Sequence, residues 1–102
     1  MVEILHNEMI LIRHVHLGAE KIKEGKEPTE TGVKVIKAIF PDLYQALINF
    51  TFEEAIDILN RHKENSLIKD DIEIILSPEG IEYVKKGLEF IKKYSQEEIN
   101  SE

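Results

Sequence analysis

Two short stretches of this chain resemble one another and lie 62 residues apart. Residues 18–25 (GAEKIKEG) align with residues 80–87 (GIEYVKKG), with four identities in eight positions. Each stretch follows an aliphatic run, at residues 9–12 in the first case and 72–76 in the second. An internal duplication predicts two related halves about a pseudo-twofold axis, and the seam between such halves is a frequent place for a ligand or partner.

The sequence allows two alignments of the repeat, which give different boundaries. The offset of 62 gives repeat units of approximately 1–44 and 51–95 within a single domain, 1–102. Residues 32–37 also match the segment that begins at Gly80, with an offset of 48. Under this second alignment, residues 16–28 are an insertion between a strand and its helix.

The aliphatic runs predict two β-hairpins. Residues 2–5 and 8–15 flank the pair His6-Asn7, and residues 66–69 and 72–76 flank the pair Asp70-Asp71. Two β-rich runs that are separated by two turn-forming residues are typical of a hairpin. We therefore expect an α+β fold of two related strand-strand-helix units, with an antiparallel sheet of about four strands packed on helices.

Helix starts are more sharply defined. Ser77-Pro78 combines a capping hydroxyl with a proline suited to the first helical turn. Thr51, with Glu54 three residues later, has the form of a capping box and predicts a helix from Phe52 to about Arg61. The apolar pattern predicts further helices over residues 31–40 and 42–50, which Pro41 separates.

Composition narrows the classes of function. The net charge is −7, from 20 acidic and 13 basic residues. This balance argues against binding nucleic acid, which requires clustered positive charge. No run approaches the roughly 18 apolar residues of a membrane span, so we expect no membrane association.

The chain has no cysteine, which excludes disulfides and thiolate chemistry and favours an intracellular location. Its charge is carried mainly by Glu and Lys, isoleucine is abundant, and glutamine is scarce, a bias typical of thermophilic proteins. In size and composition the chain resembles the small orphan proteins of hyperthermophilic archaeal viruses. That resemblance implies a viral protein that acts in the cytoplasm of its host.

Two histidines are candidates for chemistry. His14 and His16 lie two residues apart, so on the predicted strand they share one face. Such a pair can bind zinc when a third ligand converges, although two polar residues at the solvent side of a strand end are the commoner arrangement.

Residues 10–14 (ILIRH), with residues 29–32 (TETG) and 77–78 (SP), also resemble motifs of the histidine phosphatases. That resemblance implies a phosphorylated His14, but Val15 and Ile81 replace the family's expected glycine and second arginine.

The aromatic residues favour a binding role. Tyr44, Tyr83 and Phe90 exceed what the obvious apolar stripes require, and such side chains are enriched at interface cores. We find no converging catalytic set and no phosphate-binding loop, and therefore expect neither enzymatic activity nor a cofactor. The leading hypothesis is a non-enzymatic module that binds a protein or peptide through a groove or sheet edge between the repeats. A homodimer is compatible with this module, and a small histidine-centred hydrolase or metal-binding enzyme is the alternative.

Overall fold

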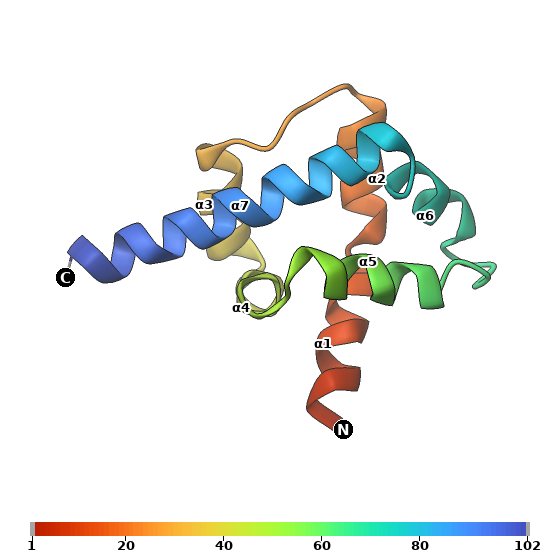
Figure 1. Ribbon diagram of the computed structural model, residues 1–102, viewed down its shortest axis with the longest axis horizontal. Coiled ribbons are helices and arrows are strands. Elements are labelled where there is room, and N and C mark those ends of the chain that lie inside the picture. The colour runs from red at the N-terminus through yellow and green to blue at the C-terminus, as the bar shows by residue number, and fades with distance from the viewer. Residues whose placement is uncertain (1, 102) are drawn as a thin grey trace.

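The computed structural model describes residues 2–101, and the side chains of residues 6–97. This part of the chain is all-helical and contains no strand (Figure 1). The predicted α+β fold with its four-stranded sheet is therefore wrong. The helices are α1 (Val2–Arg13), α2 (Val15–Lys23), α3 (Glu30–Ile39), α4 (Pro41–Asn49), α5 (Phe52–Arg61), α6 (Lys69–Ile75) and α7 (Pro78–Ser101).

Neither predicted hairpin is present: the first is replaced largely by α1, and the second by a turn at residues 66–68 followed by α6. Residues 2–5 and 8–13 belong to α1, which runs through His6 and Asn7 without a turn. Asp70 and Asp71 lie in the first turn of α6, where carboxylates complement the positive end of the helix dipole. A short run that is apolar on every side suits a buried helix as well as a buried strand. Isoleucine lowers helix propensity by only a few tenths of a kcal/mol, which burial readily offsets.

The predicted helix starts are confirmed. Thr51 caps α5 through a reciprocal pair of hydrogen bonds with Glu54. Ser77 precedes α7, where its Oγ accepts a hydrogen bond from the N–H of Gly80 at 3.1 Å and donates one to the carbonyl of Ile74 at 2.6 Å. The helices predicted over 31–40 and 42–50 are also present as α3 and α4, and proline stands at the first position of α4.

The long helix α7 is the element on which most of the others pack. It runs across the molecule in Figure 1 and contacts helices α2, α3, α4, α5 and α6. Its predicted apolar stripe is correct, since Leu88 and Ile91 are buried and Ile81 and Val84 are partly buried. Away from α7, helix α2 packs on α6 and helix α1 packs on α4.

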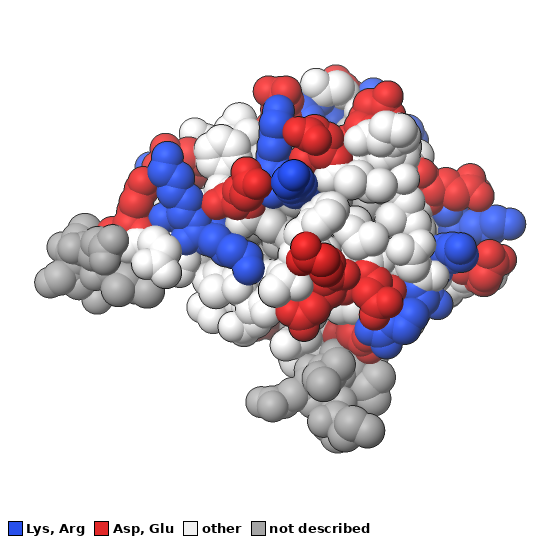
Figure 2. Space-filling model, in the orientation of Figure 1, with Lys and Arg blue, Asp and Glu red and all other residues white. Residues whose placement is uncertain are grey.

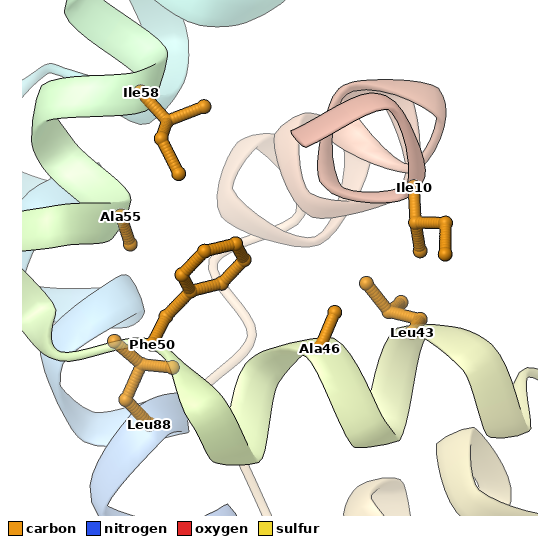
Figure 3. Packing of buried hydrophobic residues seen from close by; sticks show 7 residues of the cluster. All are labelled: Ile10, Leu43, Ala46, Phe50, Ala55, Ile58 and Leu88. Atoms are coloured by element: carbon orange, nitrogen blue, oxygen red, sulfur yellow. The ribbon is translucent and has the colours of Figure 1, made fainter. Parts of the chain in front are cut away.

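Three clusters of buried side chains form the core. The largest joins helices α1, α4, α5 and α7, and the ring of Phe50 lies between α1 and α5 (Figure 3). The second joins α2, α5 and α6, and the third lies between α3, α4 and α7. Ile12 and Val84 pack against both of the first two clusters and connect them.

The two matching stretches, residues 18–25 and 80–87, differ in secondary structure. Residues 80–87 are wholly inside α7, whereas residues 18–25 cover the end of α2 and the turn after it. Gly25 there has φ of +72°, in the left-handed region that favours glycine. The hairpin that was expected to precede each stretch is absent from the described residues, so the repeat cannot be a strand-strand-helix unit. The duplication itself stays a prediction.

Candidate functional site

The surface of the described residues has a partly open hollow where α1, α4 and α5 meet. Its volume is about 240 Å³. We call it the α1/α4/α5 hollow, and it is lined by Asn7, Asn49, Phe50, Glu54, Asp57, Ile58 and Arg61. The lining thus combines two buried apolar side chains with two amides and three charged groups.

The sequence builds this hollow at the junction between α4 and α5. Phe50 ends α4 in an extended conformation and is 7% exposed, which anchors the junction in the core. The N–H of Thr51 donates to Oε1 of Glu54 at 3.1 Å, and the N–H of Glu54 donates to Oγ1 of Thr51 at 3.1 Å. The capping box therefore fixes the carboxylate of Glu54 at the edge of the hollow.

One lining residue, Arg61, pairs with a buried carboxylate. Glu8 on α1 is only 4% exposed, and Arg61 on α5 contacts its Oε1 through Nη2. Nε of Arg61 also lies 3.3 Å from Oδ2 of Asp57, one turn earlier on α5. One guanidinium thus spans a buried and an exposed carboxylate. Because a buried carboxylate is costly without a partner, this contact ties α1 to α5.

The surface around the hollow is acidic. Glu53 and Glu54 lie in the first turn of α5, and Asp57 follows one turn later. Figure 2 shows acidic side chains gathered over α5 and basic ones toward the end of that helix. Glu53 and Glu54 complement the positive end of the helix dipole, which stabilises this concentration of charge.

The capping box yields a stability prediction. Replacing Thr51 with alanine is expected to lower the free energy of unfolding by about 1.5 kcal/mol, because alanine removes the Oγ1 acceptor of the Glu54 N–H and weakens the reciprocal bond from the backbone N–H of residue 51. The control is Thr29→Ala at the start of α3, where the threonine hydroxyl accepts from Gly32 and no glutamate reciprocates. Urea denaturation followed by circular dichroism measures both losses. An equal or larger loss for Thr29→Ala would contradict the assignment.

The three predicted partner-binding aromatics do not form one exposed patch. Tyr44 is 3% exposed and packs in the core with Ile91, and its ring meets that of Tyr94 edge-on with centroids 6.5 Å apart. Tyr83 is partly buried, and burial raises the pKa of its phenol. Phe90, 36% exposed, is the one with the most open side chain. Tyr44 therefore packs in the core, and it is not among the residues that line the α1/α4/α5 hollow.

The two candidate histidines occupy different environments. His14 separates α1 from α2 and packs edge-on against Phe40, with ring centroids 4.7 Å apart. His16 is exposed on α2, with Nδ1 3.3 Å from Oδ2 of Asp71. The strand that would have put them on one face is absent, and the described residues contain no group of three or more side chains suited to a metal ion.

His14 gives a pH prediction. Burial first, and the charge of Arg13 second, lower the pKa of His14 below its ordinary value of 6.5. The unfolded chain therefore takes up this proton more readily, and stability should fall as the pH drops through 6.5 toward the folded-state pKa. Urea melts at about pH 7.5 and about pH 5.5 should show a smaller drop for His14→Gln than for the parent. The variant His62→Gln serves as the control, and an unchanged drop in His14→Gln would contradict this reading.

The hollow contains residues that the sequence analysis missed. The pairing of Thr51 and Glu54 was visible as a capping box, but its place beside a hollow was not. Glu8 and Arg61 are 53 positions apart in the sequence, and no local pattern links them. The one available signal was an acidic residue inside the aliphatic run of α1, since such a residue requires a partner when it is buried.

Comparisons with known proteins give no match to a protein family, to a curated protein or to a solved structure. Within residues 2–101, no helix combines the length and apolar character that crossing a bilayer requires.

Proposed function

We propose that this protein is a non-enzymatic binding module that holds a segment of a partner protein at the α1/α4/α5 hollow. The observation that carries the proposal is the composition of the hollow, which buried Phe50 and Ile58 line together with the polar residues Asn7, Asn49 and Asp57. Recognition sites commonly combine an apolar floor with a few convergent polar groups. A partner side chain can bury its apolar part on the floor and pair its polar end at the rim.

The size of the hollow favours a side chain over a free metabolite. Its volume of about 240 Å³ is below the roughly 300–1,000 Å³ of pockets that enclose small-molecule ligands. The partner segment must therefore contact the surrounding surface of α5 as well. Addition of a strand to a sheet edge, the route expected from the sequence, is not proposed, because residues 2–101 contain no sheet.

We propose a partner other than a second copy of this chain. Two copies that each carry a net charge of −7 repel one another. The proposal places this interaction inside a cell, since a chain without cysteine suits a reducing compartment.

Peptide selection tests the proposal. The purified protein is used to select binders from a random peptide library, and the selected peptides are titrated into isotope-labelled protein. We expect amide resonances of Asn7, Asn49 and neighbouring α5 residues to shift most. Peptides that shift another surface instead, or a failure to select any peptide, would contradict the proposal. Sedimentation of the free protein checks the expected absence of a dimer.

A matched pair of variants sharpens this test. Asn49 and Asn60 are both exposed, and each side-chain amide donates to the carbonyl four residues earlier, at 3.0 and 3.1 Å. Asn49 lines the hollow, whereas Asn60 is not among its lining residues. Asn49→Trp should fill the hollow and weaken binding about tenfold, with Asn60→Trp close to the parent. Equal losses in the two variants would show that the hollow is not the site.

A further inference from the structure

We infer that the group held in the α1/α4/α5 hollow is the cationic side chain of a lysine or arginine in a basic partner segment. This inference rests on the proposed function and names the chemistry of its partner. Three features carry it: the charge around the hollow, the apolar residues in its lining, and the electrostatic field that the net charge of the whole chain produces.

The charge balance at the hollow is negative. Its lining holds the acidic residues Glu54 and Asp57 and one basic residue, Arg61, which also pairs with the buried Glu8. Arg61 contacts both Glu8 and Asp57, so its charge is shared between two carboxylates. The carboxylate of Glu54 accepts a hydrogen bond from the N–H of Thr51. A further cation at the rim would therefore be attracted to the site.

The hollow also suits the shape of a basic side chain. Lysine and arginine carry long methylene stems that lie on apolar surface while the charged end stays near water. Phe50 and Ile58 line the hollow and supply apolar contacts through the small part of each residue that stays exposed, 7% and 3%. Asp57 has 69% of its side chain exposed and can meet the charged end at the rim. The amides of Asn7 and Asn49 add hydrogen-bonding oxygens to the lining.

The field of the whole protein favours the same partner. A net charge of −7 attracts basic segments from a distance and accelerates their association at low ionic strength. This diffuse field does not by itself select a site on the surface. Local selection must come from the hollow, and the experiment therefore separates the two contributions.

Four labelled peptides test the inference by fluorescence anisotropy. Each is a glycine-serine peptide with two variable positions, occupied by lysine, arginine, norleucine or glutamate. Norleucine keeps the methylene stem of lysine and removes its charge. We expect the lysine and arginine peptides to bind at least about fivefold more tightly than the norleucine peptide, with the glutamate peptide weakest. Added salt should weaken binding of the two basic peptides most.

A second matched pair distinguishes the site from the diffuse field. Asp57→Asn and Asp70→Asn change the net charge equally, but Asp70 lies on α6 away from the hollow's lining. Asp57→Asn should lower the affinity for the lysine peptide by about threefold or more, and Asp70→Asn should lower it by less than about 1.5-fold. Circular dichroism confirms that both variants keep the fold.

Each adverse outcome overturns a different part of the inference. Equal binding of the norleucine and lysine peptides would assign the hollow to apolar side chains. Equal losses in Asp57→Asn and Asp70→Asn would leave only the diffuse field. Spermidine that displaces the lysine peptide and binds as tightly would assign the hollow to small polycations. If none of the four peptides binds, but neutral or acidic library peptides shift Asn7 and Asn49, the inference fails while the proposed function stands.

Discussion

Replacing Gly80 with alanine is expected to lower the free energy of unfolding by about 3 kcal/mol, because the new methyl group has no room. Gly80 is buried in the first turn of α7, where that helix starts directly after α6. A Cβ at this position would come within 3.0 Å of the backbone carbonyl oxygens of Ile74 and Ile75. Backbone atoms cannot rotate away as a side chain can, so the whole junction between α6 and α7 must shift.

The control for this prediction is another glycine of the same helix. Gly87 lies inside α7, and a Cβ there would meet Cγ of Pro28 at an ordinary 3.8 Å. Gly87→Ala should therefore raise the free energy of unfolding by about 0.5–1 kcal/mol, since alanine favours a helix interior over glycine. Urea denaturation measures both changes. A Gly80→Ala variant as stable as the parent would refute the tight junction.

Replacing Ile72 with alanine is expected to cost about 3 kcal/mol. Ile72 is 0% exposed and is the largest of the fully buried side chains among the described residues. It packs with Val15, Ala19, Leu59 and Ile75 in the cluster between α2, α5 and α6. Its truncation would remove apolar contacts and leave a cavity that the surrounding helices fill only in part.

Three further variants make this result informative about the fold. Ile39→Ala, at a side chain 63% exposed, should change stability by less than about 0.5 kcal/mol. On a strand Ile72 and Ile74 would share a face, whereas on α6 the buried pair is Ile72 and Ile75. Ile75→Ala should therefore cost more than Ile74→Ala, as measured in the same urea melts. The reverse order would favour the strand.

Helix starts were predictable because their signals are local. The hydroxyl of Thr51 and the carboxylate of Glu54 pair within one turn of helix. At the start of α7, the hydroxyl of Ser77 likewise accepts a hydrogen bond from a free backbone N–H, and Pro78 needs no such partner. These interactions depend on neighbours in sequence and hardly on the rest of the fold. The apolar stripe of α7 is equally visible, since its repeat of three to four residues has no counterpart in a strand.

The isoleucine-rich runs were mispredicted because their local signals conflict. β-branched side chains favour strands, and the acidic pair Asp70-Asp71 is as suited to a turn as to the first turn of a helix. Tertiary packing decides between strand and helix here, because α2, α5 and α7 cover α6 closely enough to bury Ile72 and Ile75. That information is spread over distant parts of the chain.

The candidate site was hidden for the same reason. Asn7, Phe50 and Arg61 come from α1, the end of α4 and the end of α5, and only the packing of these helices brings them together. The contact between Glu8 and Arg61 likewise links distant positions. Aromatic content alone gave a different set of residues, of which Tyr44 is in the core.

The central place of α7 has a consequence for how the protein is made. This helix begins only at Pro78, after all the other helices in chain order, yet five of them pack against it. A ribosome adds about 5–20 residues per second, so helices α1 to α6 emerge before the element on which most of them pack. The parts of their apolar faces that α7 covers stay exposed for that interval. Cooperative folding should therefore begin only once α7 has left the exit tunnel, and ribosome-bound chains stalled before residue 78 should be sensitive to protease.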